Sequence, residues 1–241
     1  MDFQYNYFPE MQYGGFSNAD GTILFYTRVN ALIQPTHTLI DIGCGRGVYA
    51  NDPVPYRQRL RILKDKCAKV IGIDINPDAN LNPYLDEFRL IEGNRWPLES
   101  KSVDICLADN VLEHLLVPDN LFNEARRILK PGGYLCLRTP NIMSYFGLIS
   151  KLIPNQKHGQ ILKKLKQTSQ ADIFPTFYKC NTIYSVKRML NKYNFSKCVY
   201  GHDPEPAYLH FSKFLYFIGF IHQRVAPQLF KVSIHAYARK N

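Results

Sequence analysis

The first 141 residues alternate between short apolar runs and longer stretches whose apolar residues are spaced for one face of a helix. The apolar runs predict strands at residues 38–42, 69–73, 88–91, 103–108 and 134–138. The helical spacing predicts helices at residues 22–33, 56–66 and 118–129. A helix is also expected to start after Gly47, with an interruption at residues 52–55 because proline cannot sit inside a helix, and residues 130–133 are expected to stop the preceding helix and form a turn. Because strands alternate with helices, the pattern predicts a parallel sheet with crossover helices, and therefore an α/β fold.

The pattern changes beyond residue 141. Helices are expected at residues 142–153 and 182–192, and strands at 195–200 and 229–238. Residues 1–20 predict a loop or short helix that folds over a site, and residues 154–180 show no clear period. We expect a single domain over 1–241, which divides into an N-terminal cap at 1–36, a core at 37–141, a basic insertion or lid at 142–180 and a C-terminal helix and strands at 181–241.

A glycine-rich turn follows the first predicted strand. The strand ends around Asp41, and glycine then occupies every second position, at Gly43, Gly45 and Gly47. Glycine has no Cβ, so such a turn allows positive φ and lets the backbone approach a ligand closely. The dinucleotide fingerprint of dehydrogenases has its third glycine one position later. This chain has Val48 there, which disfavours a nicotinamide oxidoreductase.

Three predicted strands end in an aspartate. Asp41, Asp74 and Asp109 come at the ends of the first, second and fourth strands. In open sheets of this kind, ligands bind at the carboxyl ends of the strands. We therefore expect the three carboxylates to face one crevice beside the glycine turn.

Cysteine usage and the apolar runs limit the classes of protein. The six cysteines are scattered and form no Cys-x-x-Cys pair, so a zinc site or a disulfide framework is not expected. We expect buried thiols in a reducing cytoplasm. No secretory signal is visible at the N-terminus, and no run reaches the roughly 20 apolar residues that a membrane-spanning helix needs.

The net charge of +10 is unevenly distributed. Residues 1–150 hold 15 Lys and Arg against 17 Asp and Glu, whereas residues 151–200 hold 10 against 1. The basic character therefore lies outside the glycine turn, in the C-terminal part. Such an asymmetry indicates an acidic partner or substrate near residues 151–200.

The motifs occur in an order that resembles one enzyme family. Asp-x-Gly-x-Gly-x-Gly is followed by Gly-Ile-Asp, Glu-Gly-Asn, Val-Asp-Ile, Leu-Glu-His and Leu-Lys-Pro-Gly-Gly. Over residues 37–141 this order resembles the small-molecule type of class I S-adenosylmethionine-dependent methyltransferases. The resemblance implies a Rossmann-like sheet of seven strands, mostly parallel with an antiparallel last strand and with helices on both faces. It also implies methyl transfer from S-adenosylmethionine, which leaves S-adenosylhomocysteine, without a metal.

The resemblance also implies a set of cofactor contacts. Asp74 matches the residue that binds the ribose hydroxyls, and Asn94 stands where the family has an acidic residue near adenine. Trp96, the only tryptophan, fits either a place in the core or an adenine-stacking role. The full set of expected cofactor residues is Asp41, Gly43, Cys44, Gly45, Gly47, Asp74, Ile75, Asn94, Arg95, Trp96, Asp109 and Asn110.

A general base is needed if the acceptor is a hydroxyl group. His114 is the first candidate, because it follows the fourth strand close to the expected crevice. His158, His202 and Asp109 are alternatives. An amine or carboxylate acceptor can react without a base.

The acceptor must be recognised by the parts outside the core. Residues 174–178 and 204–209 resemble segments of enzymes of surface-glycan or lipid-linked sugar biosynthesis, which implies a small-molecule or glycan acceptor, and we expect O-methylation. The basic segment 151–200 indicates that this acceptor is anionic. Two rival interpretations remain open, an RNA or tRNA methyltransferase and a non-catalytic methyltransferase-like binding module. No RNA-binding module is recognisable, so nucleic acid is the less favoured partner. The aromatic stretch at 211–221 is expected in the core or at an oligomer contact, with a membrane surface next in order.

Overall fold

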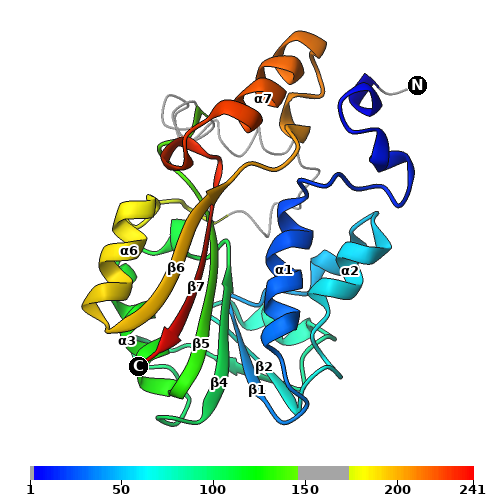
Figure 1. The fold of residues 1–241 in the computed structure, drawn as a ribbon. Coiled ribbons are helices and arrows are strands. Elements are labelled where there is room, and N and C mark those ends of the chain that lie inside the picture. The colour runs from blue at the N-terminus through cyan, green and yellow to red at the C-terminus, as the bar shows by residue number, and fades with distance from the viewer. Residues whose placement is uncertain (1–2, 146–173) are drawn as a thin grey trace.

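A seven-stranded sheet forms the centre of the molecule, which we describe from a computed structural model covering residues 3–145 and 174–241 (Figure 1). The strands lie in the order β3-β2-β1-β4-β5-β7-β6. Their bounds are β1 Thr38–Ile42, β2 Lys69–Asp74, β3 Glu87–Leu90, β4 Val103–Asp109, β5 Leu129–Pro140, β6 Phe195–His202 and β7 Ser233–Lys240.

The last strand runs against the others. β1 to β5 pair in parallel, whereas β7 is antiparallel to both β5 and β6. Six strands therefore share one direction, and β7 alone is reversed. This confirms the Rossmann-like, mostly parallel sheet with an antiparallel last strand.

Helices cover both faces of the sheet (Figure 1). Their bounds are α1 Gly21–Leu32, α2 Pro55–Arg61, α3 Pro118–Ile128, α6 Ile183–Lys192 and α7 Lys213–Val225. Phe25 and Val29 of α1 belong to one core cluster, and Phe122 of α3 and Val186 of α6 belong to the other. The sheet is thus buried on both sides, as its near-continuous apolar strands require.

Four sequence expectations need correction. A short 3-10 helix, Val48–Asn51, replaces the helix expected directly after Gly47, and α2 starts at Pro55 because proline fits the first position of a helix. α2 ends at Arg61, short of residue 66.

The stretch 130–133, expected as a turn, lies inside β5, where the pairing with β4 shifts register. β7 begins at Ser233, four positions later than expected. The helix expected at 142–153 lies mostly outside the described residues.

The chain leaves the sheet between β6 and β7 to form α7 (Figure 1). The N-terminal segment packs against this excursion through aromatic rings. The ring centroids of Phe3 and Tyr216 are 5.0 Å apart, and those of Tyr7 and Phe220 are 4.8 Å apart. Residues far apart in sequence therefore form one aromatic cap beyond the carboxyl ends of the strands. No helix among the described residues is long and apolar enough to cross a bilayer.

Candidate cofactor site at the carboxyl ends of the strands

The three aspartates expected at one crevice come from neighbouring strands. β1 lies between β2 and β4, and Asp41 pairs in register with Gly72 on one side and Leu107 on the other. Asp74 and Asp109 are the last residues of β2 and β4. The sheet order therefore brings the three carboxylates to the same edge, as the motif spacing predicted.

The glycine turn has a left-handed backbone at each glycine. The φ angles are +65° at Gly43, +52° at Gly45 and +76° at Gly47. A Cβ at Gly43 would lie 2.8 Å from Cγ2 of Val111, and one at Gly47 would lie 2.6 Å from Oδ1 of Asn82. A Cβ at Gly45 would meet no atom within 4 Å. Two of the glycines are thus needed for packing, while Gly45 leaves an open surface for a ligand.

Hydrogen bonds from β2 and the segment after it fix the shape of the turn. The buried Asn82 side chain donates through Nδ2 to the carbonyls of Cys44 and Gly45, at 3.1 and 3.2 Å. Asp74 accepts the Gly45 N–H at 3.0 Å and the Asn76 N–H at 2.9 Å, one at each oxygen. A carboxylate has about four acceptor positions, so Asp74 retains capacity for a ligand. Sequence reasoning missed Asn82, because nothing in its local pattern marks it as a support for residues 44–45.

Asp109 forms a buried ion pair that the sequence did not reveal. Arg138, near the end of β5, donates to both Asp109 oxygens at 2.6 Å, and the Tyr26 hydroxyl donates to Oδ2 at 3.0 Å. Burial alone would raise the pKa of Asp109, but Arg138 and these hydrogen bonds hold the pKa below its ordinary value. Asp109 is therefore ionised and its charge is largely compensated within the protein.

Asp41 lies in a different electrostatic environment. Burial raises the pKa of Asp41 to about 7, and the charges of Asp109 and Asp74 add to the effect, opposed by Arg61. Asp41 is therefore divided between its acid and carboxylate forms near neutral pH. A cation placed beside it would favour the carboxylate.

Arg61 supplies positive charge at the rim of this crevice. Its guanidinium stacks 4.9 Å from the Tyr49 ring centre, and its NH2 atom lies 3.9 Å from Oδ2 of Asp109. Its Nε is buried without a hydrogen-bond partner. Arg61 therefore retains a donor that no group in residues 3–145 or 174–241 satisfies.

The loop after β3 has exposed residues followed by a buried one. Asn94 and Arg95 are exposed, and Oδ1 of Asn94 accepts a hydrogen bond from Nδ2 of Asn120 at 2.9 Å. Trp96 is only 7% exposed and belongs to the core cluster that includes Ile71 and Leu121. Of the two alternatives expected for Trp96, this burial favours a place in the core over an adenine-stacking role. Ile75 is 69% exposed directly after Asp74 and offers an apolar surface there.

His114 lies at the end of the short 3-10 helix Leu112–His114, which follows β4 and the exposed Asn110. Its Nδ1 lies 2.9 Å from the carbonyl oxygen of Pro175. A carbonyl only accepts, so Nδ1 carries a proton, and in a neutral ring the lone pair is at Nε2. The ring nitrogen Nε2 of His202 contacts the carbonyl of Ala19 instead. His158 lies outside the described residues.

The backbone beside His114 is held by a buried polar network that sequence reasoning missed. The Thr139 hydroxyl donates to Oε2 of Glu113 at 3.0 Å, and Nδ2 of Asn181 donates to the Thr139 oxygen at 2.6 Å. The Glu113 carbonyl accepts the N–H of Phe177 at 2.7 Å. This network ties the His114 helix to β5 and to the segment beginning at residue 174.

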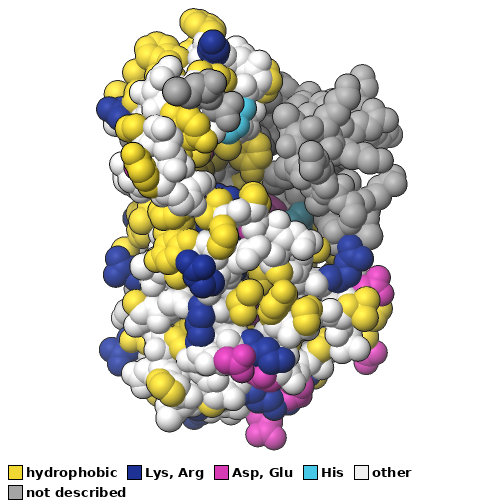
Figure 2. Space-filling model, turned by 90° about the vertical axis from the view of Figure 1, so that its right-hand side faces the viewer, with side chains coloured by type: hydrophobic (Ala, Val, Ile, Leu, Met, Phe, Trp, Pro, Cys, Tyr) yellow, Lys and Arg dark blue, Asp and Glu magenta, His cyan; other side chains and the backbone are white. Residues whose placement is uncertain are grey.

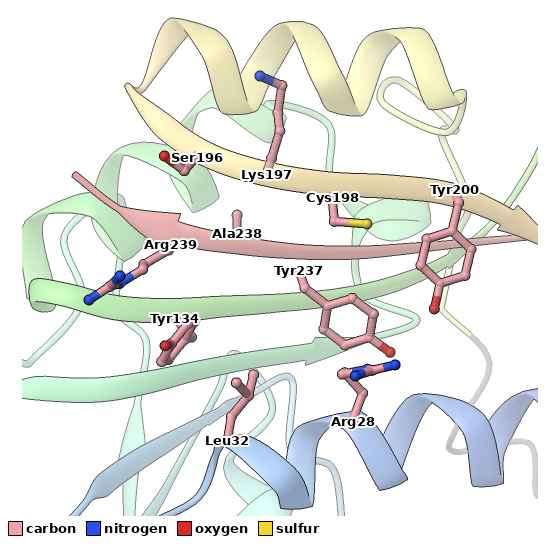
Figure 3. A pocket seen from close by; sticks show the side chains of 10 residues that line it. All are labelled: Arg28, Leu32, Tyr134, Ser196, Lys197, Cys198, Tyr200, Tyr237, Ala238 and Arg239. Atoms are coloured by element: carbon pink, nitrogen blue, oxygen red, sulfur yellow. The ribbon is translucent and has the colours of Figure 1, made fainter.

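A separate cavity of about 480 Å³ lies over β5, β7 and β6, beside α1 (Figure 3). Tyr134, Tyr200 and Tyr237 line it, together with Arg28 and Arg239. None of the three strand-end aspartates lines it, so it is distinct from the candidate cofactor site. Among the described residues, no group of three His, Cys, Asp or Glu side chains is positioned to share a metal ion.

Known proteins resemble this chain chiefly in the region of the site. Residues 40–137 match the family model described as a methyltransferase domain. An uncharacterised methyltransferase of Mycobacterium leprae is 31% identical over 115 residues, which are 45% of this chain and 39% of that protein. One of Mycobacterium bovis is 33% identical over 116 residues, 46% of this chain and 42% of the relative. The matched region thus spans about two fifths of each relative.

Solved structures share the fold at low sequence identity. A SAM-dependent methyltransferase from Thermotoga maritima has a TM-score of 0.56 and 14% identity, covering 99% of this chain and 96% of its own. Geranyl diphosphate C-methyltransferase from Streptomyces coelicolor has a TM-score of 0.56 and 14% identity, covering 91% of this chain and 75% of its own. Residues 40–137 are therefore similar to a methyltransferase domain, and the chain shares the fold of these solved methyltransferases.

Proposed function

We propose that the protein transfers the methyl group of S-adenosylmethionine to a hydroxyl group of an anionic small molecule or glycan. The observation that carries the proposal is the left-handed glycine turn, open at Gly45, beside the carboxylates of Asp41, Asp74 and Asp109. The proposal assigns the cofactor core to residues 37–141 and acceptor recognition to residues 1–36 and 142–241. All six cysteines are unpaired, which supports a reducing compartment such as the cytoplasm.

The residues present fit the cofactor. In the proposal, Asp41 accepts hydrogen bonds from the ammonium of the methionine end, and the guanidinium of Arg61, whose side chain is 24% exposed, pairs with the methionine carboxylate. Asp74 retains acceptor positions for the ribose hydroxyls, and two hydroxyl donors to one carboxylate make charge-assisted contacts. The exposed Ile75 packs on the adenine ring, with Asn94 and Arg95 at its edge. S-adenosylmethionine supplies an electrophilic methyl group on a sulfonium centre.

The protein contributes positioning and a proton acceptor. Holding the acceptor oxygen in line with the methyl group converts a bimolecular reaction into an intramolecular one. His114 removes the hydroxyl proton through Nε2, because Nδ1 is occupied by the Pro175 carbonyl. The Glu113–Thr139–Asn181 network holds the backbone that carries this imidazole.

The acceptor class rests on charge. Residues 151–200 hold ten basic residues against one acidic residue, and Lys and Arg pair well with phosphate. Of these, residues 174–200 are described, and Lys187 and Arg188 are exposed on α6. A sugar or lipid that carries phosphate therefore fits the proposal better than a neutral acceptor.

Incubation with labelled S-adenosylmethionine and a panel of acceptors tests the proposal. The panel should contain nucleotide sugars, polyprenyl-phosphate sugars, neutral glycans and bulk tRNA, with mass spectrometry of the products. We expect one extra methyl on an oxygen of a phosphate-bearing acceptor, at a rate that falls as salt screens the contact. Methylation of tRNA alone would replace the proposal with the RNA-directed alternative. Binding of the donor with no transfer to any class would favour a binding module.

A further inference from the structure

The outward face of α7 is apolar, unlike that of an ordinary surface helix. Hydrophobic side chains are exposed at the end of the molecule that carries α7 and the N-terminal segment (Figure 2). Phe214 is 70% exposed, and Phe217, Ile218 and Ile221 are each between 42% and 47% exposed. The apolar surface continues on both sides of the helix, where the exposed residues are Phe211, Val225, Leu229 and Phe230. A helix at a protein surface normally turns charged and polar residues outward. An exposed apolar patch of this kind marks an interaction surface.

The inward face of α7 fixes the helix to the rest of the protein. The buried Tyr216 donates from its hydroxyl to Oε1 of Glu205 at 2.8 Å. Gly219 packs so closely on Pro206 that a Cβ would lie 2.7 Å from that ring. Nε2 of Gln223 donates to the Asp203 carbonyl at 3.1 Å. Of the outward side chains, Phe217 adds a ring contact, with its centroid 6.3 Å from that of Tyr7. Phe214, Ile218 and Ile221 are not among the side chains that make these contacts, so most of the outward face is available to bind something else.

The exposed charges of α7 and of the turn after it have one sign, since the acidic residues that contact the helix, Asp203 and Glu205, are largely covered on its inward side. Residues 206–232 contain Lys213, Arg224 and Lys231 and no Asp or Glu. The guanidinium of Arg224 lies 4.1 Å from the Phe220 ring centre, and Lys213 lies 6.0 Å from the ring centre of Phe3. Cations thus stand at both ends of the helix and at the following turn, beside the apolar side chains. An amphipathic surface of aromatic and aliphatic residues with flanking cations is typical of helices that lie in the plane of a membrane.

We propose that the outward face of α7 docks on a membrane surface that contains anionic lipids. The apolar side chains would enter the interfacial region, and Lys213, Arg224 and Lys231 would face the lipid phosphates. A second copy of the chain is a poorer occupant, because a symmetric contact would bring the same cations together with no acidic residue to pair them. The inference does not depend on the proposed methyl transfer, since vesicle binding requires neither donor nor acceptor.

The position of α7 indicates what a membrane contact through this helix would do. The helix lies beyond the carboxyl ends of the strands, at the end of the sheet where the candidate cofactor site lies (Figure 1). A membrane docked on α7 would therefore face that end of the molecule. An acceptor anchored in the membrane would then be delivered to the site by diffusion in two dimensions.

Co-sedimentation of the full chain with vesicles tests the proposal. The probes are phosphatidylcholine vesicles and vesicles in which about one third of the lipid is phosphatidylglycerol, each at low and high salt. We expect binding to the anionic vesicles that weakens at high salt, and much weaker binding to phosphatidylcholine alone. The triple variant F214Q/I218Q/I221Q should bind at least about tenfold more weakly.

Two further variants make the outcome specific. Tyr184→Gln removes an apolar side chain that is 72% exposed on α6, and it should leave vesicle binding unchanged. The double variant K213E/K231E should weaken binding to anionic vesicles only. Circular dichroism and binding of S-adenosylhomocysteine check that each variant remains folded. Unaltered vesicle binding by the triple variant, or a wild-type chain that does not bind vesicles, would overturn the proposal. A dimer that the triple variant abolishes, without vesicle binding, would assign the face to a second copy.

Discussion

Two surfaces at the same end of the sheet differ in which side chains they bury and which they expose. At the ends of β1, β2 and β4, charged groups are buried and held by partners, such as Asp109 with Arg138. On α7, large apolar side chains such as Phe214 are exposed and have no role in holding the helix. In the first region stability and binding depend on the same residues, whereas in the second they are separable. Substitutions in the first region should therefore change both stability and binding, whereas substitutions on the outward face of α7 should lower binding alone.

The largest expected difference between the two regions is in the free energy of unfolding, for a variant that breaks the Asp109–Arg138 ion pair. Arg138→Met leaves the Asp109 carboxyl group buried without its main partner and close to Asp41, and breaking a buried pair on one side costs about 3–5 kcal/mol. Urea unfolding should show this loss. F214Q/I218Q/I221Q on α7 should stay within about 1 kcal/mol of the wild type, because outward-facing substitutions have small effects. Equal losses in the two variants would remove the contrast. R138M/D109N should recover part of the loss, because it removes the carboxyl group that lacks its partner.

The next effect is on turnover. His114→Ala should lower the rate at saturating acceptor by about 10²- to 10⁴-fold, because a positioned general base contributes that much. The affinity for S-adenosylhomocysteine should stay the same, since His114 contacts Pro175 and no part of the glycine turn. Single-turnover kinetics and calorimetry measure the two quantities. An unchanged rate would exclude His114 as the base, and a parallel loss of affinity would indicate a structural role.

Two glycines of the same turn should separate packing from ligand approach. Gly47→Ala forces a Cβ against Asn82 at a φ of +76° and should destabilise the fold by about 1–3 kcal/mol. Gly45→Ala meets no protein atom within 4 Å and should cost only about 1 kcal/mol for its left-handed backbone. Both variants should bind the donor weakly, but Gly45→Ala for a different reason, because its methyl occupies ligand space. Thermal unfolding and calorimetry on both variants give the comparison. Full donor binding by Gly45→Ala would show that no ligand approaches there.

A further effect on stability is a pH dependence from Asp41. Its pKa of about 7 in the folded protein exceeds the unfolded value, so the folded state holds the proton more tightly. The contribution of Asp41 to stability therefore falls as pH rises from about 4 to 7 and is constant above that. Asp41→Asn should gain stability relative to the wild type across this window, measured without donor. A difference between the two proteins that does not change with pH would contradict the raised pKa.

The local parts of the site could be predicted from the sequence. The strand 69–73 is a buried apolar run that ends at Asp74, and the glycine turn is contiguous, so both follow from short stretches. The partners of these residues could not be predicted. Arg138 is 29 positions from Asp109 and Tyr26 is 83 positions away, and only the strand order brings them together. Such pairs have no signal in local periodicity.

The sequence also did not determine which apolar side chains are buried. Trp96 directly follows the exposed Asn94 and Arg95, yet its ring is in the core, because the buried carboxylate of Glu124 accepts its backbone N–H at 2.8 Å and fixes the loop inward. The stretch 211–221 was expected in the core or at an oligomer contact, with a membrane surface next. In the structure its residues are divided between a buried inward face and an outward face on which Phe214 and Ile218 are exposed. Only Tyr216 and Gly219 are buried within α7. An apolar run does not by itself tell which of its faces is covered.

Calorimetric titration of S-adenosylhomocysteine into the wild type and into Asp74→Asn is the most direct test of the central claim that the strand-end site holds the methyl donor. We expect one saturable site in the wild type and an affinity at least about tenfold lower in Asp74→Asn, because the amide loses charge-assisted acceptance of the ribose hydroxyls. Thermal unfolding should show that Asp74→Asn remains folded at the temperature of the titration. No measurable binding to the folded wild type, or equal affinity in both proteins, would contradict the account.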